Sequence, residues 1–503
     1  MTTAITQKKG HPQGLYLLFF TELWERFGYY TLATIIVLYL VQGMKIPDAR
    51  AYLLYGAFSA LLYLTPALGG YLADRYLGFQ RSIVLGGVLF IVGYGITALP
   101  GSSQLFFIGL AILVVANGFF KPNVSSIVGT LYGPNDPRRD GGFTLFYMGI
   151  NIGSLIPPLF IGVVVHYYGW HIGFLFAAVG MLIGMITFAV GHARLGSKGT
   201  MPEYSPLQQK RRKLGFHVFL LIGILAAIAL LQLCFAYPGS TNILVVIGSL
   251  LILAVVVYFL LKEKKVQRDK MIASLILIAI SVGFWALYNQ TFSSLMLFAD
   301  RNMNMNFLGF KINAEFTQFF NPFFIILLSP VLSRFWIKAA KKSKNPSTPM
   351  KFALGVLFIA LGFLLLAVGA NYFGHAGLTS PWWLVMSYFL QTIGELLLSP
   401  VGLAMITVLS PRRLVGMMMG VWFLSQAAAF AIGGELATLA AIPNGLSSAA
   451  SLPIYAHAFT VFGWITLGLA VVSFALVPYL KRLIGVAHEE EQDISSEIEQ
   501  VVT

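Results

Sequence analysis

The chain reads ELWERFGYY at residues 22–30, inside its first long apolar run near 15–42. Each charge at the middle of a bilayer costs about 2.5–3.5 kcal/mol on insertion scales, so Glu22, Glu25 and Arg26 need a function or good partners. On a helix, residues 22, 25, 26, 29 and 30 share one face. We expect this face to line a polar cavity; the alternative is a purely structural ion pair within the helix.

The same spacing predicts how these charges pair. Glu22 and Arg26 are four residues apart, so a direct bond between them is expected. Glu25 and Arg26 are sequence neighbours, and we expect their side chains not to face each other squarely.

The composition is that of a membrane protein. Of 503 residues, 57% are hydrophobic and only 10% are charged, whereas soluble domains carry about 25% charged residues. In hydrocarbon the backbone must satisfy its own hydrogen bonds, so apolar runs of about 20 residues must be helices. We predict an all-α membrane protein with fourteen spans, near 15–42, 50–76, 80–99, 103–131, 141–168, 171–195, 215–236, 241–262, 269–299, 314–340, 350–370, 382–410, 414–440 and 454–485.

The positive charges follow this map. With the N-terminus in the cytoplasm, most of the 33 Lys and Arg residues fall in loops on the cytoplasmic side. Such a bias predicts the orientation, with both termini cytoplasmic. We expect a multi-pass protein of the cell inner membrane. It also explains the net charge of +14 without nucleic-acid binding.

An apolar hairpin divides the chain into parts. Basic stretches at 194–213 and 262–270 flank the hairpin 215–262, which looks inserted between two halves of six spans. We therefore predict an N-terminal six-helix bundle, an inserted transmembrane hairpin with basic linkers, a C-terminal six-helix bundle and a disordered acidic tail, over 1–195, 196–268, 269–485 and 486–503.

Two motifs carry a resemblance to known families. The string GGYLADRYLGFQR at 69–81 resembles the loop signature of the major facilitator superfamily, in which glycines allow close helix contact. The string at 22–30 matches the ExxERFxYY motif of the proton-dependent oligopeptide transporter family at every position. Further stretches resembling that family follow in order: FFKPN (119–123), FYMGINIGS (146–154), FWALYNQ (284–290), FNP (320–322), GELLLSP (394–400) and GVWFL (420–424).

The resemblance covers nearly the whole chain, and the inserted hairpin resembles bacterial members. It implies the major facilitator fold, with two six-helix bundles enclosing one central site that is reached by alternating access. It also implies proton-coupled import of di- and tripeptides. A short peptide is a zwitterion, so such a site needs cations at one end and an acid at the other.

The resemblance implies roles for individual residues. Arg26 and Lys121 would hold the substrate carboxylate, and Glu395, Asn151 and Asn321 would receive its amino end. Lys121 and Glu395 would approach each other across the cavity. Further contacts with the substrate are implied at Tyr29, Tyr30, Tyr63, Trp285, Ser399 and Trp422.

Five charges that we place in the membrane interior leave a net charge of −1 when all are ionised. They are Glu22, Glu25, Arg26, Lys121 and Glu395. A cavity of low dielectric disfavours an uncompensated carboxylate, so one bound proton would neutralise the set. We expect the coupling proton on Glu22 or Glu25; the sequence does not choose between them, because interacting groups titrate together.

The sequence departs from the family pattern at one charged pair. Many members have an arginine one turn beyond the tyrosine pair and an acid in the seventh span, where this chain has Ala33 and Asn289. Both positions are neutral together, so no orphan charge results. We therefore expect proton coupling to depend more on the carboxylates of the first helix than it does in members that have the charged pair.

Other classes of function find little support. The chain has no GxxxxGK[ST] nucleotide loop, no histidine spacing typical of a metal site and one cysteine, Cys234. We expect no enzymatic activity, no metal and no cofactor beyond the coupling proton. The expected partners are peptides, protons and membrane lipids, with no nucleic acid, and the expected working unit is a monomer. Two alternatives stay open: import of another small anion such as nitrate, and a peptide-binding sensor without transport.

Overall fold

The computed structural model describes residues 10–502 except 134–135, 137, 202–204, 206–209 and 343–344, with the side chains at 140, 210–214, 337, 340, 403, 412 and 486–502 left undescribed. In this part of the chain, 13 helices are long and apolar enough to cross a membrane. With the charged helix α1 (Gln13–Leu38) they account for the fourteen predicted spans. The prediction of an all-α membrane protein is confirmed.

Two compact units follow from the contacts along the chain. The first holds the chain up to Ala33 together with Thr65–Gln232, and the second holds Thr34–Leu64 and the chain from Leu233 onward. The helices α1 and α2 (Asp48–Leu72) each cross this division. The grouping does not follow chain order, and the domain boundaries predicted from the sequence stay a prediction.

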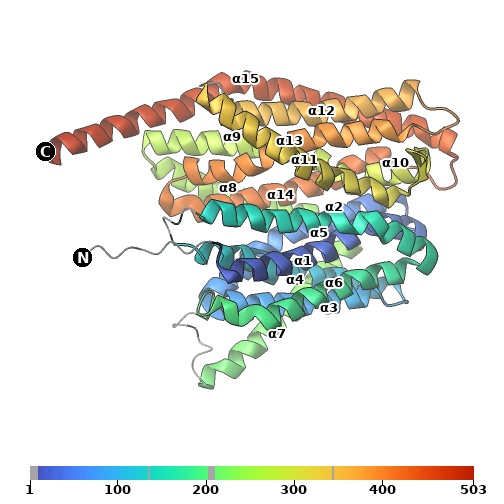
Figure 1. Ribbon diagram of the computed structural model, residues 1–503, viewed down its shortest axis with the longest axis horizontal. Coiled ribbons are helices and arrows are strands. Elements are labelled where there is room, and N and C mark those ends of the chain that lie inside the picture. Colours follow the sequence, from blue (N-terminus) through green and yellow to red (C-terminus); the bar gives the residue numbers. More distant parts are fainter. Residues whose placement is uncertain are drawn as a thin grey trace. The chain divides into compact units, whose positions relative to one another are not determined.

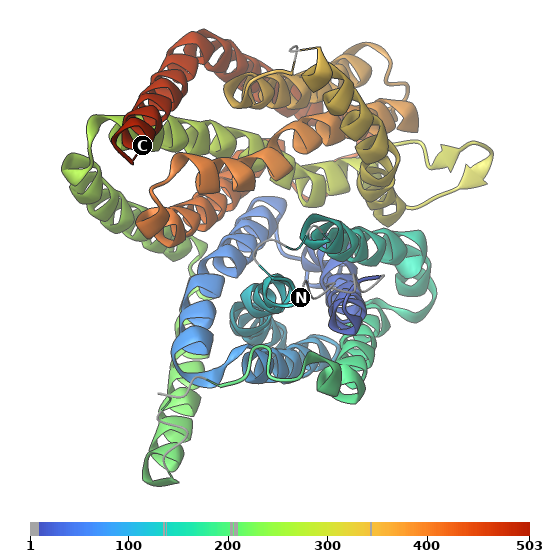
Figure 2. The same ribbon diagram turned by 60° about the vertical axis from the view of Figure 1, so that its left-hand side comes forward.

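The first unit continues after α2 with helices that pack side by side (Figures 1 and 2). The helix α3 packs against α4 and α6, and α5 packs against α6. Its elements are η2 (Ala73–Leu77), α3 (Phe79–Thr97), α4 (Ser103–Thr130), α5 (Arg139–Tyr168), α6 (Trp170–Gly191), η3 (His192–Leu195) and α7 (Lys210–Ala236), the last as far as Gln232.

Glycines bring α2 and α4 into backbone contact, as the signature at 69–81 predicts. A Cβ placed on Gly69 would lie 1.9 Å from the carbonyl oxygen of Gly118. Because lipid gives helices no hydrophobic reason to associate, small residues that permit such close van der Waals packing are a main source of affinity between membrane helices.

The second unit contains the outer parts of α1 and α2 and the rest of the chain. The helix α12 packs against α13 and α15, and α9 packs against α14. Its elements after α2 are α8 (Pro238–Lys262), α9 (Lys265–Tyr288), η5 (Asn289–Phe292), α10 (Ser294–Asn302), β1 (Asn306–Phe307), β2 (Phe310–Lys311), η6 (Ala314–Phe319), α11 (Phe320–Lys341), α12 (Thr348–Tyr372), α13 (Pro381–Leu409), η7 (Arg412–Leu414), α14 (Val415–Ala437), η8 (Thr438–Ala440) and α15 (Ser448–Val502); η1 (Tyr39–Gly43) precedes α2.

The structure adds three details to the spans predicted from the sequence. The predicted span 269–299 consists of α9, a 3-10 turn and α10. The loop that follows forms a β-hairpin, with Asn306 opposite Lys311 and Phe307 opposite Phe310. The backbone of α15 is helical to Val502; because side chains beyond residue 485 are undescribed, the disordered tail expected over 486–503 stays a prediction.

Candidate functional site

Three charged side chains lie buried on α1. Glu22, Glu25 and Arg26 are 2%, 0% and 5% exposed. Arg26 donates from Nη2 to Glu25 Oε1 at 2.6 Å and from Nε to Glu25 Oε2. Its Nε also lies 3.5 Å from Glu22 Oε1. One guanidinium therefore compensates both carboxylates, which offsets the cost of burying them.

The pairing agrees only in part with the helical spacing. The ion pair between Glu22 and Arg26 is present, as predicted. The expectation that Glu25 and Arg26 do not face each other is wrong, because the guanidinium of Arg26 donates two hydrogen bonds to the Glu25 carboxylate. The flexible arginine stem lets the planar fork turn back to the preceding side chain, where a bidentate carboxylate contact is stronger than a single bond.

The two carboxylates differ in the oxygens that they leave free. Both oxygens of Glu25 accept hydrogen bonds from Arg26. Oε2 of Glu22 is buried and accepts no hydrogen bond from the described residues. A protonated carboxyl group carries its hydrogen on one oxygen, and a proton on Glu22 Oε2 would displace no hydrogen bond from Arg26, whereas each oxygen of Glu25 accepts one.

Lys121 on α4 adds a second positive charge to this cluster. It is half-buried and interacts electrostatically with Arg26 and with both acids of α1. The ring of Tyr29 lies beneath the guanidinium, with Arg26 Cζ 4.9 Å from its centroid. The rings of Tyr29 and Tyr30 meet edge to face at 5.1 Å. The first unit thus brings together six of the predicted site residues.

A glycine of α5 fixes the position of α1 beside the cluster. A Cβ on Gly153 would lie 2.4 Å from the carbonyl oxygen of Leu23 and 2.9 Å from Arg26 Cβ. The nearby Asn151 is 6% exposed, and its Nδ2 donates to the Tyr147 carbonyl at 2.9 Å. This bond lies within α5, so the substrate role implied for Asn151 stays a prediction.

The second unit holds the remaining predicted acid among neutral donors. Glu395 on α13 is 9% exposed. Its Oε2 accepts hydrogen bonds from the Tyr288 hydroxyl and from Asn321 Nδ2, both at 2.9 Å. Asn321 Nδ2 also donates to Thr392 Oγ1 at 3.1 Å. Glu395 and Asn321 are thus hydrogen-bonded to each other, while the role in amine binding implied for them stays a prediction. Tyr288 is a partner of Glu395 that the sequence did not single out.

The aromatic residues predicted for the second unit pack in different ways. Trp285 meets Tyr288 at a centroid distance of 5.2 Å, and its Nε1 is buried without a hydrogen-bond partner among the described residues. Tyr63 stacks on Phe430 at 4.9 Å. Trp422 is 4% exposed. Ser399 is half-buried on α13, one turn beyond Glu395. No contact with a substrate is described for any of these residues, so their binding roles stay predictions.

The neutral pair that replaces the usual charges is fully buried. Ala33 is 1% exposed and Asn289 is 0% exposed. Neither Nδ2 nor Oδ1 of Asn289 has a hydrogen-bond partner in the described chain. A Cβ on Gly433 would lie 2.9 Å from Asn289 Nδ2, so the amide is packed against α14.

Sequence reasoning missed two buried acids of the second unit. Asp48, 1% exposed, accepts hydrogen bonds from both terminal nitrogens of Arg301 and from the Ile442 backbone at 3.0 Å. Glu315 at the start of η6 is 7% exposed, so the list of charges inside the spans was too short. Both acids lie at helix starts near predicted loops, where a sequence gives no sign of burial.

The described residues contain no group of three His, Cys, Asp or Glu side chains that could hold a metal ion. The predicted approach of Lys121 and Glu395 concerns residues of different units and stays a prediction.

Comparisons with known proteins agree with the motifs. The model of the POT family (PTR2) matches residues 80–452. The dipeptide and tripeptide permease B of Salmonella typhimurium is 37% identical, with 97% of this chain and 100% of that protein covered. The dipeptide and tripeptide permease A of Serratia proteamaculans is 39% identical over 94% of this chain and 92% of its own.

Solved structures give the same picture. A POT family transporter in complex with 5-aminolevulinic acid has a TM-score of 0.82 at 30% identity, with 94% of this chain and 98% of that chain covered. A peptide transporter POT in complex with sulfate has a TM-score of 0.81 at 34% identity, covering 95% of this chain and 96% of its own.

Proposed function

This chain belongs to the POT family, and on that premise we propose that it is a proton-coupled symporter that imports di- and tripeptides by alternating access. The protein is a multi-pass membrane transporter. We place it in the cell inner membrane with both termini in the cytoplasm, working as a monomer without a cofactor other than the proton.

The observation that carries the proposal is the buried charge cluster of α1 and α4. Two acids and two bases sit together there, at a depth where each charge would be costly alone. A purely structural pair would need neither the second base nor the free oxygen of Glu22. This surplus supports a cluster that exchanges a proton and an anionic ligand group.

The two ends of a zwitterionic peptide match the chemistry of the two units. Arg26 and Lys121 supply positive charge for a peptide carboxylate. In the second unit, Glu395 offers carboxylate oxygens for an amino group and is aligned by Tyr288 and Asn321. An importer of a simple anion such as nitrate would have no use for that acceptor. Trp285 Nε1 is a further donor open to a substrate.

Glu22 is the carboxylate that we assign to the coupling proton. Arg26 engages both oxygens of Glu25 but only one of Glu22. Protonation of Glu22 would free Arg26 from one of its two acids and so increase the positive charge available to the peptide. Inward transfer of a proton yields about 2.3 kcal/mol per 100 mV of membrane potential, which is the work available for accumulation.

Uptake of labelled dialanine into proteoliposomes tests the proposal. We expect accumulation above equilibrium when an inward proton gradient is imposed, and equilibration only when a protonophore abolishes it. Unlabelled dialanine should compete, and nitrate should not. Saturable dialanine binding without uptake or counterflow would instead identify a sensor, and uptake insensitive to the gradient would exclude proton coupling.

A further inference from the structure

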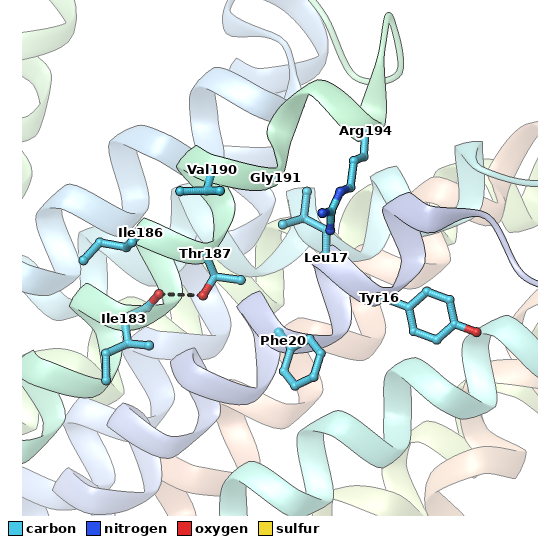
Figure 3. A pocket seen from close by; sticks show the side chains of 9 residues that line it. All are labelled: Tyr16, Leu17, Phe20, Ile183, Ile186, Thr187, Val190, Gly191 and Arg194. Atoms are coloured by element: carbon cyan, nitrogen blue, oxygen red, sulfur yellow. Dashed lines mark hydrogen bonds between the residues drawn. The ribbon is translucent and has the colours of Figure 1, made fainter.

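A groove on the surface of the first unit lies between α1 and α6 (Figure 3). It has a volume of about 420 Å³. One wall comes from the start of α1, and the other comes from the end of α6 and from η3, which carries Arg194. Its lining residues are Tyr16, Leu17, Phe20, Ile183, Ile186, Thr187, Val190, Gly191 and Arg194.

The groove is apolar along most of its length. Phe20, Ile186 and Val190 are 48%, 54% and 80% exposed. The hydroxyl of Thr187, which would otherwise be a free donor, donates to the Ile183 carbonyl at 2.8 Å (Figure 3). Apolar side chains this exposed on two helices of a multi-pass transporter face hydrocarbon, because water would disfavour them.

The floor of the groove depends on Gly191. A Cβ at this position would lie 2.4 Å from Leu17 Cδ1, so a larger residue would displace the Leu17 side chain. The glycine keeps α6 close to α1, and the longer side chains on either side form walls.

Arg194 places a positive charge at one end. Its side chain extends beside Leu17, near the start of α1 (Figure 3). None of the lining residues is acidic, and no carboxylate forms an ion pair with Arg194 in the part of the chain that the structure describes. The guanidinium is thus available to an anionic group from outside the protein.

We propose that this groove binds an anionic phospholipid, with an acyl chain along α6 and the phosphate on Arg194. From Ile183 to Arg194 the chain rises about 16 Å at helical spacing, which is roughly half of a 30 Å hydrocarbon core. The groove therefore spans one leaflet from its interior to its surface. Basic sites between membrane helices on the cytoplasmic side attract acidic headgroups, and the sequence predicts that Arg194 lies on that side.

Native mass spectrometry of the purified protein with bound lipid tests the headgroup. Phosphatidylglycerol and phosphatidylethanolamine of identical acyl chains are offered in equal amounts. We expect preferential retention of phosphatidylglycerol, and the Arg194→Gln variant should lower it about fivefold. The matched control is Lys198→Gln, an exposed base outside the groove, which should retain phosphatidylglycerol like the unmodified protein. Equal retention of both lipids, or equal loss in both variants, would overturn the proposal.

A second pair of variants tests the acyl chain. Ile186→Ser should lower retention of both lipids, because it makes the groove wall polar. Leu182→Ser is the control: it lies one turn away on α6, is 45% exposed and does not line the groove. Inorganic phosphate at millimolar concentration should not displace the lipid; displacement by phosphate, or equal effects of the two serine variants, would contradict binding of a lipid chain here.

Discussion

Arg26 donates to Glu25 Oε1 at 2.6 Å even though the two residues are adjacent in the chain. The guanidinium reaches Glu22 only through a looser contact of 3.5 Å. One arginine thus holds two buried acids unequally. Glu25 compensates the charge of Arg26 through both of its oxygens, whereas Glu22 keeps one oxygen without a hydrogen bond from the described residues.

The first prediction concerns Glu22. The variant Glu22→Gln keeps the shape of the side chain but cannot carry the coupling proton. We expect gradient-driven accumulation of dialanine to fall about tenfold or more, as losing 100 mV of driving force on one charge would remove about 2.3 kcal/mol. Counterflow of dialanine, which needs no net proton movement, should persist.

The matched control for that measurement is Glu263→Gln, which removes a carboxylate that pairs with the exposed Arg413 at 2.6 Å. It should leave both accumulation and counterflow unchanged. If Glu22→Gln accumulated dialanine normally while Glu25→Gln did not, the proton would belong to Glu25.

The second prediction concerns the two donors to Glu395. The variant Tyr288→Phe removes one of them without changing the ring. A hydrogen bond to a charged group is worth about 1.5–3 kcal/mol, so we expect the dialanine KM to rise about tenfold. Tyr372→Phe, at an exposed position on α12, is the control. The rise in KM caused by Tyr288→Phe should be smaller for N-acetylated dialanine, which lacks the free amino group. An equal rise for both substrates would show that Glu395 does not bind the amino group.

The third prediction concerns the ion pair of Asp48 with Arg301. The variant Asp48→Asn removes the charge that faces both guanidinium nitrogens. Breaking a buried pair costs about 3–5 kcal/mol, and the lower end applies here because the Arg301 side chain is 25% exposed. We expect a clear fall in the thermal unfolding midpoint in detergent. Arg413→Gln, in a pair whose arginine is 64% exposed, should leave the midpoint in place; equal shifts would mean that burial of Asp48 is not what matters.

The fourth prediction concerns the contact of α2 with α4. The variant Gly69→Ala puts a methyl group 1.9 Å from the Gly118 oxygen, so the helices must separate, at about 1–3 kcal/mol. Thermal unfolding monitored by size-exclusion chromatography should show the loss. Gly223→Ala on α7 meets no atom within 4 Å and should not destabilise. A stable Gly69→Ala protein would show that the helices can part without cost.

The helical fold was predictable because hydrocarbon leaves the backbone few choices. Apolar runs of sufficient length must become helices, and all fourteen correspond to helices in the structure. The charges of α1 were equally visible, because three charged residues within five positions of an apolar run are conspicuous. Family motifs then pointed to Glu395 and Asn321, which the structure joins.

The partners of these charges were not predictable in the same way. The bond from Arg26 to Glu25 depends on side-chain torsions rather than on spacing. The bond from Tyr288 to Glu395 joins residues 107 positions apart, and that from Arg301 to Asp48 joins residues 253 positions apart. A single sequence holds no record of such distant contacts.

The assignment of Thr34–Leu64 to the second unit has a consequence for dividing the gene. In this segment Tyr52 and Phe58 are 0% and 1% exposed, and the Tyr52 carbonyl oxygen would lie 3.1 Å from a Cβ on Gly434. A chain cut in the connection between α6 and α7 would leave this segment on one polypeptide and its packing surface on the other. Each fragment expressed by itself would expose the apolar side chains that pack together in the whole protein. We therefore expect that both fragments must be made in the same cell for either to escape proteolysis.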